Sequence, residues 1–177
     1  TQVEIRDEND NPLPIGEIGQ ICAKGPQIMK GYWNKKEESE KALKGGWMHT
    51  GDAGRMDEEG FVFIQDRIKD MIVSGGENIY STEVEAALFA HPDVVDAAVI
   101  GVPDEKYGEV VKACIVKKEG SNVTEDDLIS FCKDRIAIYK KPQTVDFIDE
   151  VPRNASGKVL KKVLREPYWK DQERQVS

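Results

Sequence analysis

The hydrophobic pattern of the chain changes once, at the charged segment DRIKD of residues 66–70. Before it, short runs of alternating apolar and polar residues are separated by turn-forming residues, which is typical of strands joined by tight turns. After it, strand patterns are mixed with segments that repeat apolar residues at helical spacing. The sequence therefore predicts an α+β protein with two parts, residues 1–66 and residues 67–177.

The first part is predicted to be a meander or a small barrel. Three segments show strand and turn patterns, VEIRDENDNPLP, GEIGQICAKG and GRMDEEGFVFIQD. One helix is expected at residues 36–44, ended by Gly45 and Gly46, because glycine suits the residue just beyond a helix.

The second part is predicted to be a compact unit with two or three strands covered by three helices. The segment MIVSGGENIY resembles two short strands around a glycine turn. Capping boxes are expected at Thr82 with Glu85 and at Thr124 with Asp127. The last helix is expected in KVLKKVLREPYW, where Pro167 would stop it.

The segment at residues 66–70 lacks glycine and proline and carries charges of both signs. It fits a linker that acts as a hinge between two domains. It fits equally well the exposed end of a strand, and the pattern alone leaves both hypotheses open.

Composition excludes several classes of protein. The chain has 177 residues with 39% hydrophobic and 33% charged residues, which is typical of a globular protein rather than a disordered one. Its longest apolar runs are far shorter than the roughly 20 residues of a membrane span. We expect no signal peptide, and the start at Thr1 resembles a cut in a longer chain.

Charge is distributed unevenly. The net charge of −8 argues against nonspecific binding of nucleic acid. Residues 153–177, however, hold seven Lys or Arg against three Asp or Glu, so this end has a local charge of +4. The patch indicates either a local anion site or merely a solvated helix face.

The cysteines and histidines argue against a zinc site. The three cysteines, Cys22, Cys114 and Cys132, stand singly, and the chain has two histidines, His49 and His91. Free cysteines of this kind are mostly small core residues of proteins in the reducing cytoplasm, so we expect a cytoplasmic protein.

Three stretches hold side chains or backbone suited to a nucleotide. Asp52, in TGD, can accept hydrogen bonds from ribose hydroxyls, although a turn aspartate is the more ordinary explanation. Arg67 can clamp a ribose or phosphate, or simply pair with Asp66 or Asp70. The SGGE segment can bring backbone N–H groups close to a ligand, or form only a tight turn.

A fourth stretch, VPRNASGKVLKK, presents a lysine. Lys158 follows Gly157 between a polar turn and a predicted basic helix. Its ammonium group can neutralise a phosphate or a developing negative charge, although a lone surface lysine usually has no such role. Each of the four stretches is a weak signal by itself.

Together, the order and spacing of these stretches resemble the C-terminal part of the adenylate-forming (ANL) superfamily, the AMP-dependent synthetases and ligases. The resemblance covers nearly the whole chain through GEIGQICAKGPQIMKGYWN, GGWMHTGDAGRMDEEGFVFIQDRIKDMIVSGGENIYSTEVE, HPDVVDAAVIGVPDEKYGE and YKKPQTVDFIDEVPRNASGKVLKKVLRE. It implies that residues 1–66 are a β-barrel-like end of a large domain. Residues 67–177 would be a small, mobile AMP-binding domain with a short antiparallel sheet and three helices.

The resemblance also implies a role for each matching residue. Asp52 and Arg67 would hold the ribose of ATP or of the acyl-adenylate, and Lys69 would be the hinge. Lys158 would be the catalytic lysine that reaches the acyl carboxylate and the α-phosphate. The loop that enters the site for the thioester step, and lines the channel for CoA, would be formed by Gly75, Gly76, Glu77 and Asn78.

The implied activity is an AMP-forming acid:CoA ligase that uses ATP, CoA and Mg²⁺ and acts on a carboxylic acid, with fatty acids favoured. No ligands for Mg²⁺ are apparent in the sequence. The phosphate-binding loop and acyl pocket of the family would lie in a missing N-terminal domain, so this chain alone would be inactive. Two alternatives remain, an adenylating enzyme with a carrier protein or another acceptor, and a noncatalytic nucleotide-binding module.

Overall fold

The computed structural model describes residues 1–170, which form two compact units, Thr1–Lys69 and Asp70 onward. The division falls three residues after the predicted boundary at 66/67. No helix in the described part of the chain is long and apolar enough to cross a membrane.

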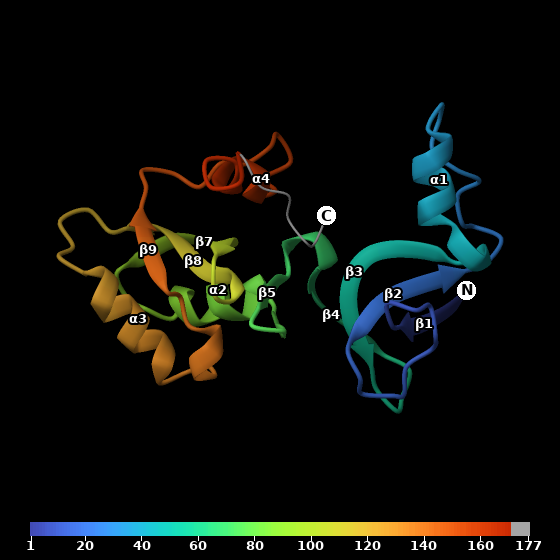
Figure 1. The fold of residues 1–177 in the computed structure, drawn as a ribbon, viewed down its shortest axis with the longest axis horizontal. Helices are drawn as coiled ribbons and strands as arrows, with labels where there is room; N and C mark the ends of the chain where they lie inside the picture. The colour runs from blue at the N-terminus through green and yellow to red at the C-terminus, as the bar shows by residue number, and fades with distance from the viewer. Residues whose placement is uncertain (171–177) are drawn as a thin grey trace. The chain divides into compact units, whose positions relative to one another are not determined.

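The first unit is built on an antiparallel meander of four strands (Figure 1). The strands are β1 (Gln2–Arg6), β2 (Gly19–Lys24), β3 (Met48–Met56) and β4 (Val62–Arg67), and each pairs with the next along the chain. The sheet order runs from β1 to β4 and does not close, so of the two predicted forms the structure has the meander and not a closed barrel. The buried residues of these strands include Ile5, Ile21, Cys22 and Ala53. Ile21 and Cys22 are adjacent, and the pairing of β2 with β3 has a register shift between Gln20 and Cys22.

One helix, α1 (Lys36–Ala42), interrupts the strands of the first unit close to its predicted position. None of its residues is buried, and a short 3₁₀ turn, η1 (Lys44–Gly46), follows it. The helix ends two residues earlier than predicted, with Leu43 as its C-cap, so Gly45 and Gly46 do not end it. Both glycines have positive φ angles in the turn that follows.

The second unit contains one five-stranded sheet. Its strands are β5 (Ile72–Ser74), β6 (Glu77–Ile79), β7 (Val94–Asp104), β8 (Gly108–Lys117) and β9 (Thr144–Phe147). β8 pairs with β7 along one edge, and with β5 and then β9 along the other. Because β8 and β9 run parallel, the predicted two- or three-stranded antiparallel sheet is corrected to a larger, mixed one.

Helices cover both faces of this sheet. The main core lies where α2 (Ser81–Phe89) and α3 (Glu125–Lys133) pack, and it includes Val84, Leu88, Val99, Ile115 and Leu128. A smaller cluster of Ile100, Val102 and Cys114 receives Leu164 of α4 (Lys161–Arg165). Figure 1 shows α4 and α3 on opposite sides of the sheet, and the prediction of three helices is confirmed.

The two predicted capping boxes had different outcomes. Thr124 and Asp127 form one at the start of α3, where Asp127 N donates to Thr124 Oγ1 and Thr124 N donates to Asp127 Oδ2. At the start of α2 no side chain caps the helix, so the box of Thr82 and Glu85 was wrong. Glu85 Oε1 instead accepts a hydrogen bond from Val99 N at 2.8 Å, which ties α2 to the sheet.

Candidate functional site

The charged segment at the end of the first unit has two parts. Asp66 and Arg67 are the last residues of β4, which supports the strand-end hypothesis, although Asp66 is buried rather than exposed. Residues Ile68–Asp70 follow as a 3₁₀ turn, η2, in which Lys69 is exposed. Lys69 therefore precedes the division between the two units, and its role as a hinge remains a prediction.

Asp52 and Arg67 lie opposite each other on β3 and β4. Arg67 Nη1 is 2.8 Å from Asp52 Oδ1, while the Arg67 and Asp52 side chains are 51% and 24% exposed. The two predicted ribose-binding side chains therefore form one accessible group that presents both acceptors and donors. The alternative predicted a surface salt bridge of Arg67 with Asp66 or Asp70, and that was wrong, because the guanidinium pairs with Asp52 and Asp70 pairs with Arg165.

Local backbone geometry fixes the direction of Asp52. Thr50 Oγ1 donates to Ile21 O at 2.9 Å and accepts a hydrogen bond from Asp52 N at 3.1 Å. Gly51 between them has φ +75°, a conformation that residues with a side chain rarely adopt. The three residues of the TGD motif thus form a local turn within β3 that is anchored to β2.

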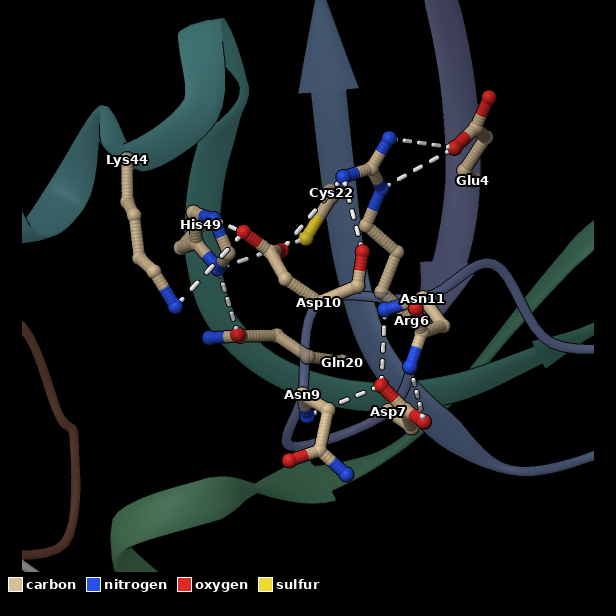
Figure 2. A network of polar contacts seen from close by, with 10 residues as sticks. All are labelled: Glu4, Arg6, Asp7, Asn9, Asp10, Asn11, Gln20, Cys22, Lys44 and His49. Carbon is tan, nitrogen blue, oxygen red and sulfur yellow. Dashed lines mark hydrogen bonds and ion pairs between the residues drawn. The ribbon is translucent and has the colours of Figure 1, made fainter.

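A polar network anchors the start of β3 (Figure 2). His49 Nδ1 is 2.7 Å from Gln20 Oε1, and His49 Nε2 is 3.4 Å from Asp10 Oδ1. Lys44 Nζ lies 3.8 Å from the other oxygen of Asp10, and Arg6 Nη1 contacts the Asp10 carbonyl oxygen at 3.2 Å. The network therefore holds the turn after β1 against the strand that carries Asp52.

The same network includes Cys22, whose Sγ is 3.6 Å from His49 Nδ1. Cys22, His49 and Asp10 thus lie in the order of a nucleophile, a base and an acid. The Cys22 side chain is fully buried, however, and burial raises the pKa of its thiol to about 11. A thiol that stays protonated is a poor nucleophile, so this arrangement is structural.

The predicted loop at Gly75 and Gly76 is a two-residue hairpin turn between β5 and β6. Ser74 pairs with Glu77, and the φ angles of the two glycines are +59° and +87°. Two successive positive φ angles are typical of a type I′ turn, which glycine favours. Gly75 N also donates to Tyr107 O at 2.8 Å, so the exposed loop is held against the β7–β8 turn.

Glu77 and Asn78 follow this turn on β6, and both are exposed. Among residues 1–170, no hydrogen bond or ion pair connects the side chain of Lys158 with Gly75, Gly76, Glu77 or Asn78. The structure therefore presents the loop and the lysine as separate features of the second unit.

Lys158 lies in a loop, three residues before α4 begins, because the helix is shorter than predicted. Its backbone N donates to Asn154 Oδ1 at 2.9 Å, and its side chain is exposed. The ammonium group has no hydrogen-bond or ion-pair partner in the described part of the chain. Lys158 is therefore fixed through its backbone, while its charge stays available to a ligand.

The helix after Lys158 is anchored by ion pairs that sequence patterns did not indicate. Lys161 Nζ lies 2.7 Å from Glu85 Oε1 and contacts Ser81 Oγ, both on α2. Arg165 Nη1 lies 2.9 Å from Asp70 Oδ1, at the first residue of the second unit. These pairs join residues 76 to 95 positions apart, so no local signal in the sequence could have revealed them.

All three cysteines are free and buried. Burial raises the pKa of Cys114 and of Cys132 to about 11, as it does for Cys22. The prediction that they are core residues is confirmed. Residues 1–170 contain no cluster of three or more His, Cys, Asp or Glu side chains that could hold a metal ion.

Comparison with known proteins places these features in context. The model of the family described as AMP-binding enzyme C-terminal domain matches residues 83–158. A long-chain-fatty-acid–CoA ligase of Escherichia coli is 45% identical over 94% of this chain and 29% of its own length. A feruloyl-CoA synthase of Amycolatopsis is also 45% identical, over 95% of this chain and 34% of its own length.

A solved structure shows the same fold. ATP-bound MatB from Rhodopseudomonas palustris superposes with a TM-score of 0.88 at 41% identity, over 94% of this chain and 34% of that one. The chain thus spans about a third of the length of the proteins it matches. The α+β class predicted from the sequence is confirmed.

Proposed function

Because the chain belongs to the adenylate-forming superfamily, we propose that it is the carboxyl-terminal part of an AMP-forming acid:CoA ligase. The observation that carries the proposal is the alignment of nearly the whole chain with two CoA-forming enzymes at 45% identity. The geometry supports it, since the Asp52–Arg67 pair and the Lys158 ammonium group are exposed and chemically suited to a nucleotide. Residues 1–66 would end the large domain, and residues 67–177 would form the small one.

The proposed reaction has two steps. In the first, an oxygen of the substrate carboxylate attacks the α-phosphorus of ATP, the bond to the β-phosphate oxygen breaks, and pyrophosphate leaves. In the second, the CoA thiolate attacks the acyl carbon and AMP leaves with the electrons of the broken C–O bond. The products are an acyl-CoA thioester and AMP.

Lys158 would act in the first step. The attack brings two negatively charged groups together, so a cation between them stabilises the transition state and aligns the reactants. Asp52 would accept hydrogen bonds from the ribose hydroxyls, and Arg67 would assist at the same ribose. The described residues offer no cluster of ligands for Mg²⁺, so we assign this chain no step that depends on the metal.

The second step would need a different arrangement. A lysine held between the carboxylate and the phosphate would obstruct the incoming thiol. We propose that the second unit turns about Lys69, which withdraws Lys158 and brings in the loop of Gly75, Gly76, Glu77 and Asn78. The position of Lys69 next to the division between the units supports this proposal.

The names of the relatives indicate which carboxylic acids the enzyme could use as substrate. We propose a fatty acid, in agreement with the name of the Escherichia coli relative. The feruloyl-CoA synthase is equally similar to this chain, so an aromatic acid is the second candidate substrate. Three buried free cysteines support a reducing compartment such as the cytoplasm.

Exchange of radiolabelled pyrophosphate into ATP tests the proposal, using the full-length protein with a panel of carboxylic acids. We expect exchange that depends on one class of acid and needs no CoA, followed by thioester formation when CoA is added. Exchange without thioester formation would indicate another acceptor, such as a carrier protein. Nucleotide binding without exchange for any acid would refute the proposal in favour of a noncatalytic module.

A further inference from the structure

The loop that carries Lys158 is closed by one side chain, that of Asn154. Asn154 Oδ1 accepts hydrogen bonds from Ser156 N at 3.1 Å, Ser156 Oγ at 2.8 Å and Lys158 N at 2.9 Å. Asn154 N donates to Lys158 O, and Gly157 N donates to Asn154 O, both at 2.9 Å. The four residues before Lys158 therefore form a small ring of hydrogen bonds with the lysine backbone.

Arg153 connects this ring to the sheet. Its Nη2 lies 2.9 and 2.8 Å from the two carboxylate oxygens of Asp96, and its Nη1 donates to Gly157 O at 3.0 Å. The guanidinium group thus holds a strand residue with one nitrogen and the peptide just before Lys158 with another. A lysine at position 153 could not make both contacts, because an ammonium group lacks this fork of donors.

Asp96 belongs to the sheet. It lies on β7, where it pairs with Val116 of β8 next to a register shift between Val94 and Asp96, and Asp96 Oδ1 accepts a hydrogen bond from Ala97 N at 2.9 Å. The Asp96 and Arg153 side chains are 24% and 42% exposed, so the pair is partly accessible. We expect its contribution to stability to be small, as for most such ion pairs.

Arg153 contacts both the Asp96 carboxylate and the peptide next to the exposed Lys158, which indicates a role in placing that lysine. We propose that Arg153 and Asp96 are positioning residues that act through Lys158 in the adenylation step, a proposal that rests on the proposed function. They fix where the Lys158 backbone stands relative to β7, and the lysine side chain reaches the ligand from there. A displacement of about 1 Å in a reacting group can cost about a hundredfold in rate.

The test uses the full-length enzyme with Arg153→Gln and with Asp96→Asn. We expect kcat for acyl-adenylate formation to fall about tenfold to a hundredfold, with little change in KM for ATP. Thioester formation from supplied acyl-AMP should be unaffected. Lys140→Gln is the matched control, because it breaks an ion pair of the same unit, with Glu83, that does not contact the loop.

A double-mutant cycle separates a positioning role of Arg153 from a general structural role. In a Lys158→Ala background, Arg153→Gln should cause no further loss, because a residue that acts only through the lysine has nothing left to position. The double variant should therefore match Lys158→Ala alone. If the reductions in adenylation rate caused by Lys158→Ala and Arg153→Gln multiply in the double variant, the proposal is overturned. Full adenylation activity in both Arg153→Gln and Asp96→Asn would also overturn it.

A measurement without catalysis distinguishes failure of this inference from failure of the proposed function. In amide hydrogen exchange on residues 1–177, Arg153→Gln should speed exchange at Gly157 and Lys158 more than at the β7–β8 pairs. Unchanged exchange at both amides would refute the positioning role. If Arg153→Gln speeds exchange at these amides but the wild-type enzyme forms no acyl-adenylate, the proposed function is refuted and the contact of Arg153 with the loop stands.

Discussion

Asp52 and Arg67 face each other across β3 and β4, with Arg67 Nη1 2.8 Å from Asp52 Oδ1. A register shift between Ala53 and Gly54 lies one residue pair away, beyond the pair of Ala53 with Asp66. The bulge increases local twist and redirects side chains at the end of the sheet. The pair is therefore a product of strand geometry as well as of charge.

Asp52→Asn in the full-length enzyme should weaken binding of ATP about tenfold to a hundredfold, because a hydrogen bond to a charged group contributes about 1.5–3 kcal/mol. Isothermal titration with ATP would measure the change. Asp57→Asn is the control, since Asp57 closes the turn after β3 by accepting from Glu59 N and Phe61 N. Equal loss of affinity in both variants would contradict the assignment.

Lys158→Ala should reduce acyl-adenylate formation about a hundredfold or more, as expected when a preorganised charge is removed from a transition state. Thioester formation from supplied acyl-AMP should continue at nearly the normal rate. Rapid-quench measurement of each half-reaction would test this. Lys162→Ala, which removes another exposed lysine at α4, should leave both steps intact.

Gly75→Ala should destabilise the second unit by about 1–2 kcal/mol, because a residue with a Cβ atom is strained at positive φ. The new Cβ would also lie 3.3 Å from Tyr107 Cδ1. Gly120→Ala is the matched control, at φ +75° with nothing within 4 Å, so it carries the strain without the contact. Urea denaturation should show the larger loss for Gly75→Ala.

Local signals in the sequence predicted local structure well. The box of Thr124 and Asp127 spans four residues, and the glycine turn at residues 75–76 needs only positive φ angles, so both followed from short patterns. Glu85 had the same local signal as Asp127. That prediction failed because α2 begins earlier, with Tyr80 as its N-cap, so Thr82 lies inside the helix. The Glu85 carboxylate instead contacts Val99 N and Lys161 Nζ, which are distant in sequence.

Long-range pairing explains most of what the sequence did not reveal. The parallel pairing of β9 with β8 depends on which strand edge stays free after β7 has paired with β8. Each predicted site residue lies in a short motif of its own, but the contact of Arg153 with Asp96 joins positions 57 apart. No spacing rule connects such residues, so only the folded arrangement could identify Arg153 as a partner of the Lys158 loop.

Tyr168→Phe should remove a stabilising contribution that is present at neutral pH and is lost at alkaline pH. Burial, and then donation of its hydroxyl group to Asp146 Oδ2, raises the pKa of Tyr168 to about 12. The folded pKa exceeds the unfolded value near 10, so the contribution is complete below pH about 10 and is lost as pH rises toward 12.

Urea midpoints measured between pH 8 and 11.5 would test the prediction for Tyr168. The difference between wild type and Tyr168→Phe should shrink above pH 10. The exposed Tyr32 provides the control as Tyr32→Phe, which should follow the wild type throughout. A constant difference across the whole range would show that the phenol does not titrate as stated.

Lys69→Pro should impair the thioester step and spare adenylation, the reverse of Lys158→Ala. Lys69 lies in the 3₁₀ turn η2, directly before the division between the two units, and proline would fix its φ angle near −65°. If the second unit turns through the backbone of Lys69, a fixed angle would hinder the change that the second half-reaction needs. Lys69→Ala removes the same side chain but keeps the backbone free, so it should retain CoA-dependent turnover. The two variants would be compared by stopped-flow measurement of AMP release after CoA is mixed with preformed acyl-adenylate. Equal rates of AMP release in Lys69→Pro and Lys69→Ala would exclude Lys69 as the hinge.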